Sequence, residues 1–373
     1  MAESGASREA AAKKYSCVKY SLAIIETAYL LILLFLSLAL GLSRALAFNI
    51  SQVSSSNYFI LPAYILAGYL AYYILNFPFN FYQSFVLEHK FSLSKETMKS
   101  WFADQAKGFA LSYILSLICL CAFYYVLARF PGHWWFIVSL LWILFSLILA
   151  KLVPVLIIPL FFKYKKLSDE KLRERIISLA QKMKVNILDV FEIDFSKKTL
   201  KANAAFVGWG STRRVILADT LKDKYTTDEI EVILAHEFSH YRLKHLLKLV
   251  LISSCATIFS FFLIFKTNAY FLKLSGLSSL LDVAALPVIL MFFAVVGIIL
   301  QPLENYLSRK FETDADIAAI RFTGLKDAFI STMDKLASQN LSDRSPNPVI
   351  KLFFFDHPPI DERIATARSL DPR

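Results

Sequence analysis

The chain has 373 residues, of which 56% are hydrophobic and 15% aromatic, and its mean hydropathy is +0.50. Soluble domains are usually about 45–50% apolar, so this composition excludes an ordinary soluble protein. The net charge of +11 raises nucleic acid as a partner, but the basic residues are spread over loops beside apolar runs, as the positive-inside rule describes. We therefore expect no nucleic-acid partner.

Six apolar runs are each long enough to cross a bilayer, which takes about 20 residues. Five carry no charged residue, and the first carries only Glu26. The runs are Leu22–Leu42, Tyr58–Phe79, Gly108–Ala128, Trp134–Ala150, Leu249–Phe265 and Val283–Leu303. The fourth continues through Pro154 and Pro159 to Phe162, and we expect one long kinked helix there. The runs predict a polytopic helical membrane protein embedded in the lipid bilayer.

The basic residues also predict which side of the membrane each loop faces. With six spans and a cytoplasmic N-terminus, the outer loops receive only four basic residues, Arg44, Arg129, Lys266 and Lys273. The large polar segments after the fourth and sixth spans then lie on the cytoplasmic side. We expect a bacterial inner membrane or a eukaryotic endoplasmic reticulum membrane. Nothing in the sequence sets an oligomeric state.

A polar insertion, Lys163–Tyr225, separates the fourth and fifth spans. Its segment Ser168–Met183 is typical of an amphipathic helix, because apolar residues fall on one stripe. Strands are expected at Asp189–Asp194, Asn203–Val207 and Arg214–Leu217, with a turn at Gly208 and Gly210.

The next helix begins with a capping box, Thr226 followed three residues later by Glu229. Its periodic pattern contains no Gly or Pro as far as Phe265, so we expect one unbroken helix that becomes the fifth span.

These patterns divide the chain into five regions. They are a polar tail (1–20), a four-span region (21–162), a polar insertion with a small β-sheet and the capped helix (163–245), two further spans (246–303) and a C-terminal helical segment (304–373).

This helix carries His236, Glu237 and His240 in a His-Glu-x-x-His pattern. Side chains four apart on a helix share a face, so both imidazoles can bind one metal ion. Catalytic zinc uses three protein ligands and a water molecule, and Glu237 is placed to take a proton from that water as it attacks a peptide carbonyl. The pattern predicts one zinc ion per chain. His245 is expected off this face, as an interfacial residue beside Lys244 and Lys248.

The third zinc ligand must come from elsewhere in the chain, and the segment after the sixth span offers candidates. Arg309, Glu312 and Asp316 would share one helix face. Glu312 can ligate the metal while Asp316 accepts a hydrogen bond from a ligand imidazole, as outer carboxylates commonly do. Arg309, on the same face, is expected to support the site with Asp316. Spacing alone leaves Glu304 as a competing ligand.

Several segments together resemble the type I CaaX prenyl endopeptidases, which are integral-membrane zinc proteases that remove the last three residues of prenylated proteins. The resemblance runs from about Phe77 to Arg363. Its segments are FPFNFYQSFVLEHKF, NAAFVGWGSTRRVILADTL, AHEFSH, NYLSRKFETDAD and HPPIDER. It implies a mainly α fold, a bundle of membrane helices around a large chamber, joined to a zincin-like metalloprotease domain with a small β-sheet. Family members have seven helices in this ring, whereas we expect about six here.

The resemblance also implies roles for particular residues. Glu312 would be the third zinc ligand. His357 and Arg363 would lie near the active centre, where they can stabilise the oxyanion of the tetrahedral intermediate. Asn203, Ala204, Ala205 and Phe206 would form an edge strand that aligns the substrate backbone.

The sequence therefore predicts a membrane zinc endopeptidase that cleaves prenylated CaaX proteins or peptides, with its catalytic site toward the cytoplasm. One alternative within the same chemistry is a broad-specificity quality-control protease for membrane proteins. A second alternative, a non-enzymatic transporter or scaffold, is motivated by Glu26 and Asp282 near the membrane.

Overall fold

The computed structural model describes residues 2–208 and 213–371, with side chains from residue 7 onward. Six helices within this part of the chain are long and apolar enough to span a membrane. They are α1 (Ala2–Ala39), α3 (Asn57–Phe81), α5 (Met98–Arg129), α6 (Trp134–Leu152), α11 (His245–Leu274) and α12 (Leu286–Thr323). They confirm the predicted bundle of six spans, and a shorter helix, α2 (Leu42–Val53), follows the first.

Two of the spans contain a π-helical turn. The third helix passes through Tyr82–Val86 into α4 (Leu87–Lys90), and α6 passes through Val153–Ile157 into α7 (Ile158–Phe161). Pro154 stands at the start of the second π turn, where its missing N–H accounts for the disturbed ladder. The fourth apolar run is therefore one long helix, as its sequence predicts.

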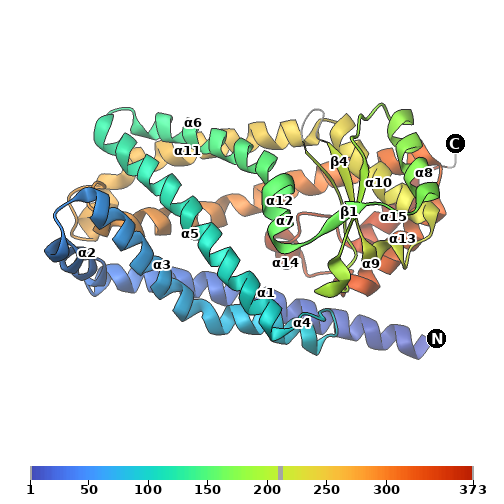
Figure 1. The fold of residues 1–373 in the computed structure, drawn as a ribbon, viewed down its shortest axis with the longest axis horizontal. Helices are drawn as coiled ribbons and strands as arrows, with labels where there is room; N and C mark the ends of the chain where they lie inside the picture. The colour runs from blue at the N-terminus through green and yellow to red at the C-terminus, as the bar shows by residue number, and fades with distance from the viewer. Residues whose placement is uncertain (1, 209–212, 372–373) are drawn as a thin grey trace.

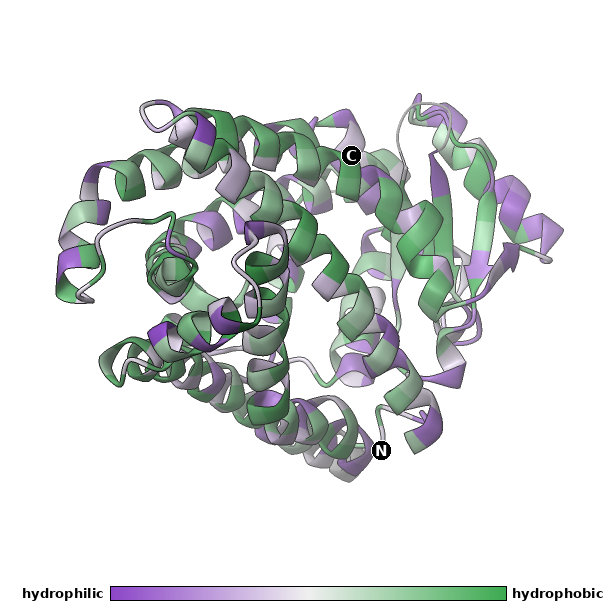
Figure 2. Ribbon diagram, turned by 60° about the vertical axis from the view of Figure 1, so that its left-hand side comes forward, coloured by the Kyte–Doolittle hydropathy of each residue, from purple (hydrophilic) through white to green (hydrophobic). Residues whose placement is uncertain are grey.

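The six spans contact one another in a closed circuit, α1–α3–α5–α6–α11–α12 and back to α1. Most of their apolar stretches are uncovered by other parts of the protein: the buried share is 0% in α1, 6% in α6 and 44% in α12. Apolar side chains on this scale are stable only beside lipid, which supports the membrane assignment. Figure 2 shows the long helices mainly hydrophobic, with polar residues concentrated toward the sheet.

A four-stranded sheet lies at one end of the spans, together with both ends of the described chain (Figure 1). Its strands are β1 (Tyr164–Lys166), β2 (Val190–Ile193), β3 (Ala204–Val207) and β4 (Arg214–Ala218). Their order is β1-β2-β4-β3, with β2 and β4 parallel and the other pairs antiparallel. Three of these strands were expected. The predicted turn includes Gly208, which has φ 101°, and Gly210, which lies outside the described residues.

Helices pack against the sheet and make up the C-terminal segment. The amphipathic helix α8 (Glu170–Lys182) buries Leu172, Ile176 and Leu179 against the strands, as predicted. The remaining helices are α9 (Asp219–Lys222), α10 (Thr227–Arg242), α13 (Lys326–Asn340), α14 (Pro348–Phe354) and α15 (Ile360–Ser369), with 3-10 turns at Phe195–Lys197 and Val283–Ala285. The polar N-terminal tail is helical and continues directly into the first span.

The expectation of one unbroken helix from Thr227 to Phe265 is wrong. Helix α10 ends at Arg242, Lys244 takes a left-handed conformation with φ 56°, and α11 begins at His245. A left-handed lysine costs conformational energy and needs compensating contacts. The break separates the helix that carries His236 and His240, called the metal-motif helix below, from the fifth span.

The capping box predicted at the start of α10 is present and extends into a buried polar cluster. Glu229 accepts a hydrogen bond from the Thr226 backbone N–H at 2.7 Å, and it accepts others from Ser331 at 2.6 Å and Lys335 at 2.7 Å. Burial alone would raise the pKa of Glu229, but Lys335, Ser331 and the Thr226 N–H outweigh it and lower that pKa. The cluster ties the metal-motif helix to α13.

We expect Glu229→Gln to destabilise the protein by about 1–3 kcal/mol at neutral pH, because it leaves Lys335 without its buried partner. A carboxylate whose folded pKa is lowered contributes full stability above its unfolded pKa of about 4.3, and this contribution is lost as the pH falls through the folded pKa. Thermal unfolding in detergent should therefore show a difference between the two proteins that shrinks below about pH 4. Asp228→Asn, at an exposed ion pair with Arg175, should change stability little.

Candidate metal centre

The two motif histidines and Glu312 meet where helices α10 and α12 pack together. The Nε2 atoms of His236 and His240 lie 3.1 Å apart. One carboxylate oxygen of Glu312 is 3.2 Å from His236 Nε2, and the other is 3.3 Å from His240 Nε2. The exposed Glu304 lies two helical turns earlier on α12. Of the two candidate third ligands, the structure brings Glu312 to the histidines.

The donor set fits one metal ion. The three ligand atoms lie within 4.8 Å of one another, and Glu312 Oε2 is buried and makes no well-aligned hydrogen bond among the described residues. Ligands held tetrahedrally at about 2.0–2.1 Å from one ion stand about 3.3 Å apart. The observed separations of 3.1–3.3 Å match this spacing. His236 and Glu312 are buried and His240 is partly exposed.

Asp316 lies directly behind His236. Its carboxylate is 2.8 Å from His236 Nδ1, the ring nitrogen on the far side from Glu312. It also accepts two hydrogen bonds from the Arg363 guanidinium of α15, at 2.7 and 2.6 Å. Burial would lower the pKa of Arg363, but Asp316, Glu312 and Glu237 outweigh it and raise that pKa. Arg363 thus holds Asp316 as a charged acceptor for the histidine.

His245 lies behind His240 in the same way, with its Nδ1 3.1 Å from His240 Nδ1. Its side chain is only 1% exposed and stacks on the Phe311 ring, with centroids 4.7 Å apart. The expectation of an interfacial residue facing away from the motif is therefore wrong. That expectation assumed an unbroken helix, and the turn at Lys244 brings the ring back toward His240.

Glu237 lines a cavity of about 240 Å³ beside the candidate metal ligands. The cavity brings together residues from four parts of the chain: His236, Asn203 and Ala204 at the start of β3, His357, and Arg363. Its other walls are largely apolar and include Val232, Phe329, Met333 and Leu336. Glu237, the candidate metal ligands and a partly apolar cavity therefore lie together.

The four predicted substrate-binding residues divide between two settings. The edge strand β3 pairs with β4 alone, and Asn203 and Ala204 face the cavity. Phe206 packs instead against Phe238 of α10, with ring centroids 5.3 Å apart. Ala205 pairs with Ile216 of β4 and is not among the cavity-lining residues that the structure describes. The division follows position along the strand, because the cavity lies at the start of β3 and Phe206 stands two residues further on.

His357 approaches the metal ligands from the C-terminal segment. Its Nε2 is 3.3 Å from Glu312 Oε2, and its Nδ1 is 2.8 Å from Asp356. Arg309 donates hydrogen bonds to the carbonyls of Lys351 and Phe355, at 3.1 and 2.6 Å. The structure therefore places Arg309 against the segment that carries His357, and among the described contacts it touches no metal ligand.

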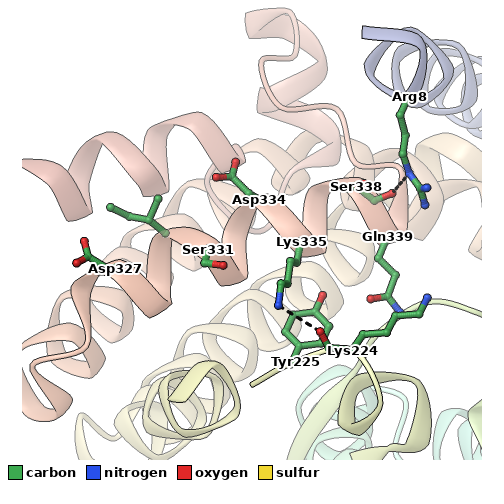
Figure 3. A pocket seen from close by; sticks show the side chains of 10 residues that line it. Arg8, Lys224, Tyr225, Asp327, Ser331, Asp334, Lys335, Ser338 and Gln339 are labelled. Atoms are coloured by element: carbon green, nitrogen blue, oxygen red, sulfur yellow. Dashed lines mark hydrogen bonds between the residues drawn. The ribbon is translucent and has the colours of Figure 1, made fainter. Parts of the chain in front are cut away.

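A larger open groove of about 790 Å³ lies elsewhere, along α13 (Figure 3). Its walls carry both signs of charge, with Arg8, Lys335 and Asp334 among them. Arg8 donates a hydrogen bond to the Ser338 carbonyl, and Lys335 donates one to the Lys224 carbonyl. None of the predicted site residues lines it, so size alone would have pointed away from the metal centre.

The chain is similar to known membrane proteases. The CAAX prenyl protease N-terminal domain, described as five membrane helices, matches residues 6–163, and peptidase family M48 matches residues 166–371. The chain is 30% identical to an uncharacterized metalloprotease of Bacillus subtilis, YhfN, over 96% of this chain and 85% of that protein. It is 31% identical to CAAX prenyl protease 1 of Saccharomyces cerevisiae, over 78% of this chain and 68% of that protein.

The fold also matches a solved structure. The crystal structure of S. mikatae Ste24p aligns with a TM-score of 0.87 at 24% identity, covering 97% of this chain and 89% of that one. The sequence-based predictions of a metalloprotease and of its family are confirmed, which excludes the transporter or scaffold alternative. The chain belongs to peptidase family M48, as a multi-pass membrane metalloprotease related to the CAAX prenyl proteases 1.

Proposed function

We propose that this protein is a zinc endopeptidase that removes the last three residues of prenylated CaaX proteins or peptides. His236, His240 and Glu312 hold the metal, and Glu237 is the general base. The observation that carries the proposal is the cluster of these four side chains, with Glu237 in the cavity beside the ligands. The relatives named CAAX prenyl protease 1 support the substrate class.

The donor chemistry supports zinc as the metal. Two imidazoles and one carboxylate with an open fourth position form a typical catalytic zinc site, and spacings of 3.1–3.3 Å suit a tetrahedral ion. Magnesium and calcium favour sites made of oxygen ligands. A zinc ion bound here would act as a Lewis acid that polarises the scissile carbonyl and makes water more acidic.

The residues of the chain then have separate tasks. Glu237 takes the proton of the attacking water and passes it to the leaving amine. His357, whose side chain is 52% exposed beside Glu312, is placed to donate a hydrogen bond to the developing oxyanion. Arg363 already donates two hydrogen bonds to Asp316, from Nε and Nη2. We therefore propose that it keeps Asp316 charged behind His236 and does not contact the oxyanion directly.

The edge strand β3 orients the substrate. An extended peptide that pairs with the free side of β3 would run past Asn203 and Ala204, which line the cavity containing Glu237. Backbone pairing of this kind holds a peptide without regard to its side chains. The apolar walls formed by Val232, Phe329 and Met333 suit aliphatic residues next to the scissile bond.

A second pocket supports a lipid-bearing substrate. This pocket, of about 690 Å³, lies between the spans α1 and α12 and the helix α14. Its walls include Ile24, Leu31, Ile298 and Phe353, and it reaches Asp356, the neighbour of His357. In a prenylated CaaX peptide the lipid is on the cysteine that precedes the scissile bond, so an apolar space close to the metal is required. The basic inner loops support a cytoplasmic position for this end of the protein.

The proposal is tested with a matched pair of peptides in detergent, one farnesylated at its CaaX cysteine and one not. Mass spectrometry should show loss of three residues from the farnesylated peptide and little cleavage of its unprenylated twin. A chelator should abolish this activity, and zinc should restore it.

Other outcomes have definite meanings. Equal cleavage of both peptides, or cuts at scattered internal bonds, would contradict the CaaX assignment and favour the broad quality-control protease. Cleavage that survives full removal of the metal would contradict the proposed zinc mechanism.

A further inference from the structure

We propose that His245 is a positioning residue that accepts a hydrogen bond from His240 and so keeps His240 in its metal-binding form. This inference rests on the metal site proposed above and is independent of the substrate. His245 is the first residue of α11, directly after the left-handed Lys244. The turn sets its ring against His240, with centroids 5.1 Å apart and planes at 73°.

The orientation of His240 fixes what its two ring nitrogens must do. Its Nε2 faces His236 Nε2 and Glu312 Oε1, at 3.1 and 3.3 Å, so Nε2 is the ligand atom and must be free of a proton. A neutral His240 then carries its proton on Nδ1, which can only donate. The atom 3.1 Å away is His245 Nδ1. His245 must therefore offer its Nδ1 as an acceptor and carry its own proton on Nε2.

The surroundings of His245 favour this assignment over an ordinary core histidine. Its side chain is 1% exposed, and among the described residues its Nε2 has no hydrogen-bond partner. A histidine kept only for packing would leave two polar atoms to be desolvated at a cost. Here one of them contacts a metal ligand. The ring lies nearly parallel to Phe311, at 17°, and Phe311 directly precedes Glu312, so the same helical turn supports His245 and the third ligand.

The two ligand histidines are thus supported differently. His236 has a carboxylate behind it, Asp316, whereas His240 has the imidazole of His245. Partners of this kind fix the ring and its tautomer, and their loss typically costs about 10–100-fold in metal affinity. The left-handed conformation of Lys244 brings His245 to His240, and this contact compensates for its conformational cost.

Two variants whose new side chains have nearly the same shape distinguish a positioning role of His245 from a packing role. His245→Asn places an amide oxygen near the position of Nδ1, where it can accept the hydrogen bond, whereas His245→Leu has the same branching and no acceptor. We expect His245→Leu to weaken metal binding by about 10–100-fold and to speed metal loss to a chelator. His245→Asn should stay within a few-fold of the original protein. Metal release is followed with a zinc-sensitive dye, and metal content by mass spectrometry.

A third variant, His245→Phe, keeps a ring that can stack on Phe311 and removes the acceptor. The proposal predicts that it loses metal as His245→Leu does, while its metal-free thermal unfolding stays near that of the original protein. Metal retention by His245→Phe together with loss by His245→Asn would overturn the proposal in favour of packing. Equal metal affinity in all variants would also overturn it. Failure of the original protein to bind metal would instead contradict the proposed function, so the two failures are distinguishable.

Discussion

Replacing Glu237 with glutamine is expected to abolish peptide cleavage and to leave the metal bound. The amide has nearly the shape of the carboxylate and cannot take a proton from water. General acid–base catalysis typically contributes about 10²–10⁴-fold, so turnover should fall by at least this factor. His236, His240 and Glu312 are unchanged, and metal content should remain at one ion per chain. Both quantities are measured on one preparation, by peptide cleavage and by elemental mass spectrometry.

Glu231→Gln is the matched control, because Glu231 lies on the same helix and pairs with Arg175 away from the cavity. It should keep near-normal turnover. Loss of metal from the Glu237 variant would assign that side chain a structural role at the site. Retained turnover with metal present would assign the general base to another residue, and His357 is a titratable candidate that lines the same cavity.

Much of the fold follows from local patterns in the sequence. Each span is an apolar run of sufficient length, and lipid-exposed backbone can satisfy its hydrogen bonds only within helices or closed barrels. The stripe of Leu172, Ile176 and Leu179 specifies α8 in the same local way. The first ligands are also local, since His236 and His240 lie one turn apart on a helix with a recognisable capping box.

The elements that were missed lack such local signals. Strand β1, Tyr164–Lys166, is three residues long and two of them are lysines, so neither hydrophobicity nor alternation indicates a strand. It forms because β2 offers an edge to pair with. The helix break at Lys244 is equally invisible, because no Gly or Pro marks it and its cost is repaid by contacts made only in the folded protein.

The supporting residues of the site show why spacing is a poor guide to contacts between distant segments. Arg309 shares a helix with Glu312, yet its guanidinium binds carbonyls more than 40 positions later. Arg363 reaches Asp316 across 47 positions. Sequence periodicity describes one helix at a time, so it can place Asp316 behind a ligand but cannot identify the cation that holds it.

The second large effect is expected at the buried ion pair between Asp316 and Arg363. Asp316→Leu removes the acceptor behind His236 and leaves the Arg363 guanidinium buried without its partner. Breaking a buried ion pair by removing one member typically costs about 3–5 kcal/mol, and loss of a partner behind a metal ligand costs about 10–100-fold in metal affinity. Thermal unfolding of the metal-free protein and chelator titration measure the two effects separately.

Adding Arg363→Met to Asp316→Leu distinguishes the two roles of the carboxylate. The double variant has no stranded charge, because an apolar pair occupies the space, and replacement of a buried ion pair by apolar residues is often neutral or stabilising. Its stability should therefore recover toward that of the original protein. Its metal affinity should remain low, because His236 Nδ1, 2.8 Å from Asp316 in the original protein, still lacks an acceptor. Recovery of both properties would mean that Asp316 serves only to neutralise Arg363, and recovery of neither would mean that the pair fixes the position of α15 itself.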